Sequence, residues 1–293
     1  EAYLMLVLSS LRFQSYWQSK SNGTTNRQRV NEADFMDCEI PFPSLKEQRK
    51  LAEKYGRTIK EAKMCEKEIK SSEAEIEDYL FESLGIVTRK RTGREKSGTL
   101  QFVRLKETAQ WGYDKNVLSF PYSFVKDNAC SFSNMPKWCL SITRGKSPIY
   151  AQEGEEYLLN QKCNRWDEID LTFVKKVDSL WLKKIDKSLL TQFNDILINS
   201  TGEGTLGRAS RIKEERHAGL FYDSHMLCLR VDERYVNAQL LVYLINSSFG
   251  QKQIEMIKSA QATKQTELGV ENVKKLQFPL PDRATQDEIA RQI

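Results

Sequence analysis

Three segments of this sequence combine amide, cationic and aromatic side chains in a way that is typical of nucleic-acid contacts. They span residues 144–150 (RGKSPIY), 160–166 (NQKCNRW) and 261–265 (QATKQ). Asn, Gln and Arg side chains can form paired hydrogen bonds with base edges, while Lys binds phosphate. Each segment taken alone favours a solvated loop over a binding site. Together they predict a surface that binds nucleic acid.

A fourth segment, Gly202-Glu203-Gly204-Thr205-Leu206-Gly207, spells the G-x-G-x-x-G pattern of dinucleotide-binding sites. In such a site the pattern opens a helix, so that pyrophosphate meets the helix N-terminus. The residues that follow, 207–212 (GRASRI), read instead as a second strand. We therefore expect a glycine-rich hairpin whose backbone lies close to another surface, and keep binding of a nucleotide or S-adenosylmethionine at GEGTLG as the alternative.

Catalytic chemistry has little support in the sequence. We find no nucleophile beside a base, no Asp/Asn-Pro-Pro-aromatic methyltransferase motif and no Walker loop. The two histidines, His217 and His225, lie in no recognisable catalytic pattern, and the six cysteines contain no C-x-x-C pair. The sequence thus predicts a binding protein without a catalytic residue, a metal site, a disulfide framework or a cofactor of its own.

Composition fits this interpretation. The 293 residues are 40% hydrophobic and 29% charged, with a formal net charge of +5, and the pI is about 8.7. The length favours two domains. A basic cluster at 89–96 (RKRTGREK) is either a solvated linker or a phosphate contact. The apolar run at 4–8 is too short for a signal sequence and has no basic residue before it, so we expect a cytoplasmic protein.

A long helix organises the chain. Pro41 and Pro43 hold an extended entry, Ser44 is a good N-cap, and Glu47 occupies the capping-box position. Some forty residues without proline follow, so a helix over 45–84 would be about 60 Å long. This length predicts a spacer or a docking helix, with folding back onto its own domain as the alternative.

An apolar seam repeats along this helix, interrupted by polar residues, as in a coiled coil. The residues predicted to bind a protein partner through the seam are Tyr55, Ile59, Ala62, Ile69, Ile76 and Leu80.

An internal repeat relates the two ends of the chain. At a constant offset of 238, Ser9-Ser10 aligns with Ser247-Ser248, and Thr25, Pro41, Pro43, Gln48 and Ala52 align with Thr263, Pro279, Pro281, Gln286 and Ala290. The repeat predicts the tail of a first module at 1–43, a long spacer helix at 44–88, a basic linker at 89–100, a second module at 101–281 and the start of a second spacer helix at 282–293.

The second module should mix strands and helices. Strands are predicted at 101–105, 196–198 and 226–231, where residues alternate or are aliphatic and β-branched. A helix is predicted at 237–259 and another at 3–17, near the start of the chain. The predicted class is α+β, a globular domain of mixed strands and helices plus a long coiled-coil helix.

These segments resemble a known family. Residues 144–148, 160–166, 195–208 and 223–225 are similar to passages in the target-recognition domains of type I restriction-modification specificity subunits. In that family each recognition domain ends in a Pro-x-Pro-x-x-x-x-Gln element, like 41–48, followed by a long spacer helix. The resemblance covers nearly the whole chain. One nearly complete recognition domain and one complete spacer helix are fewer than the family pattern, which suggests a fragment, a fused protein or a half-subunit.

The resemblance implies a non-catalytic subunit. Two recognition domains would each read half of a split double-stranded DNA site, and paired spacer helices would set their separation. Methyltransferase subunits, and in some systems a restriction subunit, would dock on this scaffold and hold the S-adenosylmethionine and ATP. A homodimer through the spacer helix is a further expectation, and a protein-interaction adaptor without DNA affinity is the alternative function.

The residues predicted to contact DNA come from the segments above. They are Arg144, Lys146, Tyr150, Asn160, Gln161, Lys162, Arg165, Trp166, Thr201, Glu203, Gly204, Arg208, His225, Lys264 and Gln265.

Overall fold

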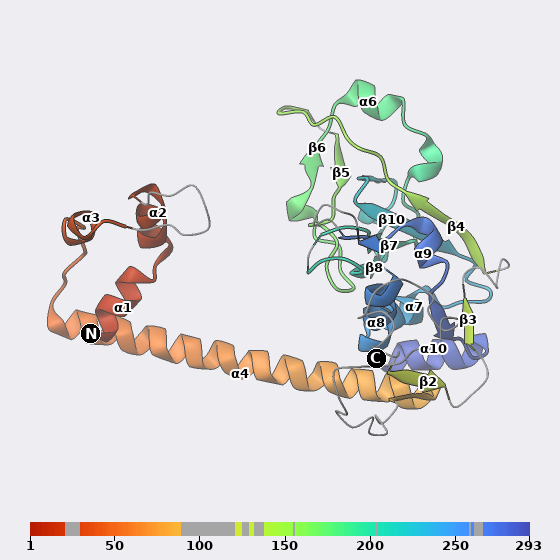
Figure 1. Cartoon of the computed structure of the whole chain (residues 1–293), viewed down its shortest axis with the longest axis horizontal. Coiled ribbons are helices and arrows are strands. Elements are labelled where there is room, and N and C mark those ends of the chain that lie inside the picture. The colour runs from red at the N-terminus through yellow and green to blue at the C-terminus, as the bar shows by residue number, and fades with distance from the viewer. Residues whose placement is uncertain are drawn as a thin grey trace, which may run out of the picture. The chain divides into compact units, whose positions relative to one another are not determined.

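The computed structural model describes residues 1–20, 30–88, 121–124, 129–131, 138–154, 156–202, 204–257, 259–260 and 266–293. The chain divides into two compact units, Glu1–Ala74 and Glu75–Ile293 (Figure 1). In its described residues the first unit is helical, whereas the second mixes helices with short strands. The α+β class predicted from the sequence is therefore confirmed. The predicted strand at 101–105 lies outside the described residues.

Four helices lie in the first part of the chain. They are α1 (Ala2–Leu8), α2 (Leu11–Lys20), α3 (Glu32–Met36) and α4 (Leu45–Leu84). A single helix over 3–17 is wrong, because the chain breaks at Ser9 and Ser10, whose hydroxyls bond back to carbonyls of α1. Tyr3, Val7 and Phe13 form a small apolar cluster.

The long helix α4 begins where the sequence predicts. The Ser44 Oγ accepts a hydrogen bond from the Glu47 amide at 3.3 Å, and the Glu47 carboxylate accepts one from the Ser44 amide at 3.1 Å. This reciprocal pair is a capping box, which satisfies backbone donors at the helix start. The same bonds lower the pKa of Glu47. The start of α4 is therefore specified by local sequence alone.

The two ends of the predicted seam have different environments. Tyr55, Ile59, Ile69 and Ile76 are exposed, and Ile69 retains 57% of its accessible surface. Leu80 was predicted to belong to this partner-binding seam, but it is only 1% exposed and belongs to the core of the second unit. Leu80 is buried because the last turns of α4 complete that core.

The second unit is built on an antiparallel sheet of four strands. Their spatial order is β4 (Cys139–Arg144), β10 (Met226–Val231), β7 (Ile196–Asn199) and β8 (Ala209–Arg211). The predicted strands at 196–198 and 226–231 are confirmed. All four residues of β7 are buried, as expected for a central strand covered on both faces.

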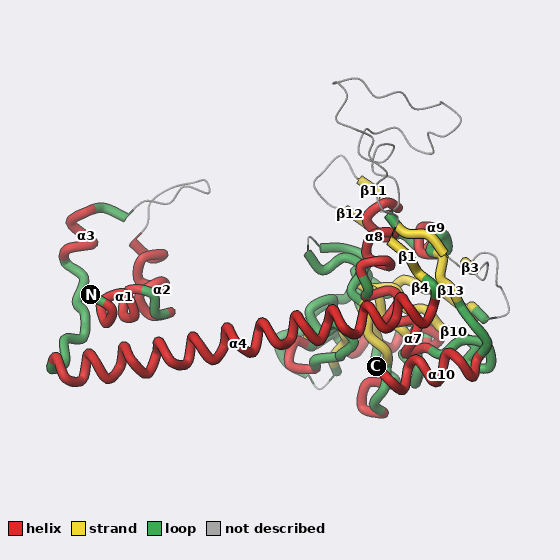
Figure 2. Tube along the Cα trace, turned by 90° about the horizontal axis from the view of Figure 1, so that it is seen from below, coloured by secondary structure: helices red, strands yellow, loops and turns green. Residues whose placement is uncertain are grey.

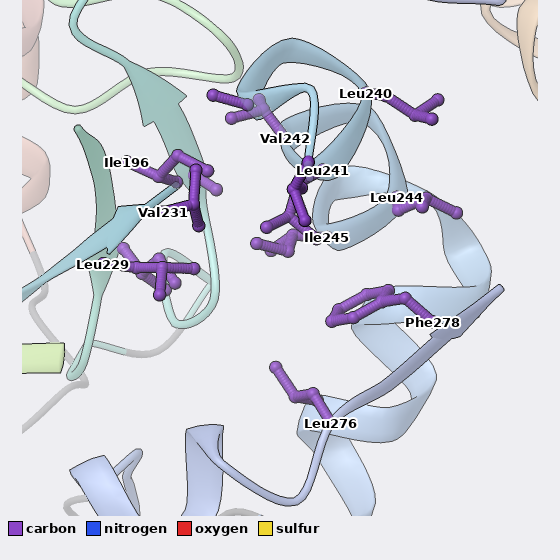
Figure 3. Packing of buried hydrophobic residues seen from close by; sticks show 14 of the residues in the cluster. Ile196, Leu229, Val231, Leu240, Leu241, Val242, Leu244, Ile245, Leu276 and Phe278 are labelled. Carbon is purple, nitrogen blue, oxygen red and sulfur yellow. The ribbon is translucent and has the colours of Figure 1, made fainter. Parts of the chain in front are cut away.

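Two helices cover one face of this sheet. α7 (Ala238–Asn246) and α8 (Ser248–Ile257) replace the single helix predicted at 237–259, because Ser247 adopts an extended conformation and ends α7. Figure 3 shows side chains of α7 packed toward Ile196, Leu229 and Val231 of the strands. Phe278 and Leu276 lie beside the same helices.

Smaller elements complete the unit. Paired strands are β1 (Ile86–Thr88) with β2 (Tyr122–Phe124), β3 (Ala129–Ser131) with β13 (Gln277–Pro279), and β11 (Ser259–Ala260) with β12 (Thr266–Glu267). The last helices are α9 (Val270–Val273) and α10 (Arg283–Gln292). Figure 2 shows α10 beside α7, and the Asn237 amide donates to the Gln286 side chain at 2.9 Å.

A second sheet stands next to the central one. It contains β6 (Lys175–Lys176), β5 (Tyr157–Leu159) and β9 (Phe221–Tyr222). Short helices lie around it, namely η2 (Leu171–Phe173), α6 (Ser179–Lys183), η3 (Lys187–Leu189) and η4 (Glu215–His217). Figure 1 shows α6 and β6 on the opposite side of the central sheet from α8 and α10.

The internal repeat appears in the structure as well as in the sequence. α4 begins at Leu45 and α10 at Arg283, and 283 − 45 = 238. α3 begins at Glu32 and α9 at Val270, and 270 − 32 = 238. The helix starts thus follow the same offset as the aligned residues.

One hydrogen bond is repeated without change. The Gln48 Nε2 donates to the Pro43 carbonyl at 2.8 Å, and the Gln286 Nε2 donates to the Pro281 carbonyl at 2.8 Å. Each bond closes the Pro-x-Pro turn onto the first turn of the next helix. This contact explains why proline and glutamine keep their spacing in both copies.

The described helices include none with the length and apolarity needed to cross a bilayer. All the cysteines whose side chains are described, Cys38, Cys65, Cys139, Cys163 and Cys228, are free thiols.

The burial of Leu84 predicts that the end of α4 stabilises the second unit. Leu84→Ala should lower the free energy of unfolding of this unit by about 2 to 5 kcal/mol, because it leaves a cavity in the core. Ile69→Ala, on the exposed part of the same helix, should change it by less than about 0.5 kcal/mol. Urea unfolding followed by circular dichroism measures both. Equal effects of the two substitutions would contradict this role.

The burial of His217 predicts a pH-dependent loss of stability. Its ring nitrogens have no hydrogen-bond partner among the described residues, and burial lowers its pKa below 6.5, with Glu214 opposing the shift. Below about pH 6.5 the unfolded chain binds a proton that the folded chain disfavours, so the free energy of unfolding should fall as pH falls through the folded pKa. His217→Gln should flatten this slope between about pH 7 and 5, whereas His225→Gln should retain it.

Candidate nucleic-acid interface

We call residues 144–148, 160–166, 195–208 and 223–225 the motif-bearing segments. Three of these four segments meet at one end of the central sheet. β10 runs antiparallel to both β4 and β7, with Leu227 opposite Arg144 and Met226 opposite Asn199. The C-terminal ends of β4 and β7 therefore lie beside the start of β10. Residues 144–148, 199–208 and 223–225 leave the sheet together at this end, although they are far apart in sequence.

The start of the 144–148 segment depends on Gly145. Its amide donates to the Met226 carbonyl at 3.1 Å, and a Cβ at this position would collide with the carbonyl oxygens of Asp223 and Tyr222. The next residue, Lys146, forms an isolated bridge with Asp223. Glycine is required here because only a residue without a side chain allows the two backbones to approach this closely.

Two buried amides attach the 160–166 segment to the same end of the sheet. The Asn164 Nδ2 donates to the Asn199 Oδ1 at 3.0 Å, to the Leu197 carbonyl at 3.1 Å and to the Arg208 carbonyl at 2.9 Å. The Asn199 Nδ2 in turn donates to the Gln161 carbonyl at 3.1 Å. Both asparagines are fully buried. The four motif-bearing segments therefore form one hydrogen-bonded structure.

A polar cluster lies at the centre of this structure. The Thr201 hydroxyl is 2.9 Å from the His225 Nδ1 and 3.3 Å from the Gln161 Oε1. The Asp223 carboxylate accepts from the His225 amide at 3.0 Å. Burial raises the pKa of Asp223, while hydrogen bonds from the His225 and Gln161 amides oppose the rise. Thr201, Gln161 and His225 thus place hydroxyl, amide and imidazole groups side by side.

Cations stacked on aromatic rings surround the cluster. The Arg208 guanidinium lies 5.4 Å from the centre of the Trp166 ring, and the Arg165 guanidinium lies 4.5 Å from that of Phe173. Desolvation, followed by the charge of Arg165, lowers the pKa of Arg208. A guanidinium stacked by its face keeps N–H donors at its edge for a ligand. The two arginines therefore give this surface positive charge and oriented donors.

The predicted residues differ in how far their side chains are already engaged. Lys162 and Trp166 are exposed, and Tyr150 is exposed beneath the Lys175 ammonium, which lies 4.6 Å from its ring centre. Lys146 and His225 are also exposed. The structure places these residues and the stacked arginines around one surface. Their contact with DNA stays a prediction.

Outside the polar cluster, Arg144, Asn160 and Arg208 also have hydrogen-bond partners within the chain, and the Arg208 Nη1 donates to the Asn164 carbonyl at 3.3 Å. Arg144 forms an ion pair with Glu267 and donates to the Leu268 carbonyl at 3.4 Å. Asn160 is buried, donates to the Phe173 carbonyl and accepts from the Lys162 amide at 2.9 Å. The Arg144 and Asn160 side chains therefore shape the loops rather than present free donors. Glu203, Lys264 and Gln265 lie outside the described residues.

The glycine-rich segment is a hairpin connection. β7 and β8 pair antiparallel on either side of it, and the Gly207 amide donates to the Asn199 carbonyl at 2.8 Å. Gly202 and Gly204 have φ angles of 97° and 77°, which favour glycine. No helix N-terminus follows the pattern, so the geometry that binds pyrophosphate in dinucleotide sites is missing here. A Cβ on Gly204 would meet no described atom within 4 Å, so its requirement for glycine is conformational.

Sequence reasoning missed several residues that shape this surface. Asn164 and Asn199 lie within the quoted motifs but were not selected, since their burial is invisible in a single sequence. Phe173 and Lys175 belong to a segment that carried no recognised motif. The Asp223 carboxylate could have been suspected from its position beside Ser224 and His225. Among the described residues, no group of three or more His, Cys, Asp or Glu side chains is placed to hold a metal ion.

Comparisons with known proteins give matches to solved structures at low sequence identity. No protein-family model matches the chain, and no curated protein matches it. The chain is similar to the crystal structure of a type I restriction-modification S subunit from M. genitalium, with 14% identity and a TM-score of 0.38 over 58% of this chain and 40% of that one.

Two further structures match over nearly the whole chain. An HsdS subunit from Thermoanaerobacter tengcongensis has 15% identity and a TM-score of 0.42, with coverage of 99% of this chain and 61% of that one. A structure that describes complex assembly and conformational transition of the type I R-M system has the same identity and TM-score. It matches over 99% of this chain and 59% of that one. The chain thus spans 40% to 61% of the lengths of these proteins.

The buried asparagine pair predicts a coupled loss of order at this surface. Asn164→Ala removes three hydrogen bonds and leaves the buried Asn199 Oδ1 without its donor, so the free energy of unfolding should fall by about 1 to 3 kcal/mol. Amide hydrogen exchange should rise in both 160–166 and 199–208. The matched control, Asn272→Ala on α9, should leave exchange in these segments unchanged. Faster exchange in only one of them would contradict the coupling.

Proposed function

We propose that the second unit recognises a DNA sequence through the surface formed by the four motif-bearing segments. The observation that carries this proposal is their convergence, through the Asn164–Asn199 bond and the β4–β10–β7 register, on one end of the central sheet. Base reading needs donors and acceptors held in fixed positions, because discrimination depends on paired hydrogen bonds. Loops joined by buried amides satisfy that need better than independent solvated loops.

The side chains on this surface suit a division of roles. Gln161 and Arg165 can form paired hydrogen bonds with base edges and the remaining Arg208 donor can add a single one, while Lys146 and Lys162 can neutralise phosphates. A net charge of +5 adds favourable long-range attraction. In this proposal Arg144 and Asn160 act indirectly, by positioning the loops that carry the reading residues.

We propose further that the chain acts as a specificity subunit of a type I restriction-modification enzyme. Support comes from the motif order and from the repeated Pro-x-Pro turn, which is closed onto a helix by the same glutamine bond in both copies. On this proposal the chain is not itself an enzyme. Methyltransferase and restriction subunits carry the chemistry and hold S-adenosylmethionine and ATP.

The exposed seam of α4 supports a protein partner in the same assembly. Tyr55, Ile59, Ile69 and Ile76 are exposed large apolar side chains at roughly heptad spacing, with Ala62 between them. We propose that a second spacer helix or a methyltransferase subunit covers this seam. An adaptor without DNA affinity would use the same seam, so affinity for DNA separates the two functions.

Selection from random duplex DNA tests sequence recognition. The chain, alone and with its cognate methyltransferase, should enrich one short sequence, and binding measured by fluorescence anisotropy should weaken steeply with salt. Arg165→Ala should relax preference at one base position at a cost of about 1 to 3 kcal/mol. Lys162→Ala should instead weaken binding to all sequences about equally and reduce the slope of log affinity against log salt by about 1. No enrichment together with partner binding would favour the adaptor.

A further inference from the structure

The segment from β6 to η3 carries a concentration of lysines that the interface above does not use. Lys175, Lys176, Lys183, Lys184 and Lys187 are all exposed and lie within 13 residues, since 187 − 175 + 1 = 13. We call residues 175–187 the lysine arm. No carboxylate in the described part of the chain lies within 4.0 Å of these five ammonium groups. By contrast, Lys213, Lys252 and Lys274 form ion pairs.

The acidic residues of the lysine arm bond to its backbone. The Asp178 Oδ1 accepts from the Trp181 amide at 2.7 Å, and the Asp186 Oδ1 accepts from the Ser188 amide at 2.9 Å. These bonds cap α6 and η3. Five lysines against the two aspartates Asp178 and Asp186 give residues 175–187 a formal net charge of +3. Positive charge therefore dominates the arm.

A separate apolar cluster fixes the lysine arm in place. Leu158, Val177 and Phe221 are buried together, and partly buried side chains from α6 and the following residues pack against them. These partly buried residues are Trp181, Leu182, Ile185, Leu189 and Leu190. The cluster spans both the strands and the arm. The lysines consequently project from a packed element rather than from an unsupported loop.

Two contacts connect the lysine arm to the interface. The Lys175 ammonium stacks on Tyr150, and its charge also acts on the buried Asp223 carboxylate. The Asp178 amide of the arm also donates to the Ile149 carbonyl at 2.9 Å. Ile149 and Tyr150 both belong to the 144–150 segment. The arm therefore adjoins the 144–150 segment of the interface.

We propose that the lysine arm binds backbone phosphates of the DNA that flanks the bases read by the interface. This inference rests on the proposed function and adds to it a contact that is independent of sequence. Lysine ammonium groups bind phosphate as point charges and carry no acceptor, so they add affinity and orientation without base preference. Their position beside the interface favours a phosphate backbone that continues past it over an unrelated acidic protein.

The test compares two pairs of lysines, and within each pair the two lysines are adjacent in sequence. Lys183→Gln with Lys184→Gln removes two charges from α6, and Lys274→Gln with Lys275→Gln removes two from the end of α9. The control pair is already engaged, since Lys274 pairs with Glu271 and Lys275 donates to Asn272. All four side chains are at the surface, and thermal melting checks that both variants fold. Affinity for the selected duplex, with and without flanking base pairs, is measured over a series of salt concentrations.

The α6 pair should reduce the slope of log affinity against log salt by about 1.8, since each lost phosphate contact contributes about 0.9. Its preferred sequence should stay the same, and the reduction should disappear when the flanking base pairs are removed. The α9 pair should retain the wild-type slope, and Lys183→Arg with Lys184→Arg should retain it as well.

Other outcomes overturn the inference in distinguishable ways. If the wild-type chain selects a sequence and the α6 pair keeps the wild-type slope, the lysine arm does not bind DNA while the proposed function stands. An unchanged slope with lost binding of a methyltransferase subunit would assign the lysines to an acidic protein surface. If the wild-type chain binds no duplex at any salt concentration, the proposed function fails and the inference fails with it.

Discussion

The hydrogen bond between two buried side-chain amides, Asn164 and Asn199, holds together the surface that we propose for DNA recognition. One asparagine belongs to a loop and the other ends a central strand, so the bond joins an irregular segment to the most regular part of the fold. Water cannot replace these partners, because both residues are fully buried. The stacked arginines and the Thr201 cluster depend on this attachment for their positions. Two internal amides thus support side chains at the surface without touching a ligand themselves.

Local signals explain most of what the sequence could predict. The start of α4 depends on Ser44 and Glu47, which lie three residues apart, and the strands at 196–198 and 226–231 are short apolar runs between polar loops. The hairpin after Gly202 follows from a second strand pattern beyond the glycines. Each of these features is determined within about ten residues. The same locality explains why the capping box and the repeated turn could be anticipated.

Features that depend on distant residues could not be predicted. Leu80 looks like its neighbours in the heptad pattern, but its burial depends on a core formed mostly by residues more than a hundred positions later. Arg144 and Asn160 have the right chemistry for base contacts, yet Glu267 and the Phe173 carbonyl engage them. The helix break at Ser247 was hidden by continuous helical periodicity. In each case a tertiary partner decides the role of a residue whose type alone is ambiguous.

The burial of the end of α4 has a consequence for the order in which the protein can fold during synthesis. Leu80 and Leu84 leave the ribosome before almost all of the core that they join, and Ile289 of α10 belongs to the same core. At about 5 to 20 residues per second, the roughly 200 residues between them take about 10 to 40 s to be made. Throughout that interval the last turns of α4 present leucines to water or to other proteins. The end of α4, made early, therefore becomes part of a finished domain only when α10 has been made.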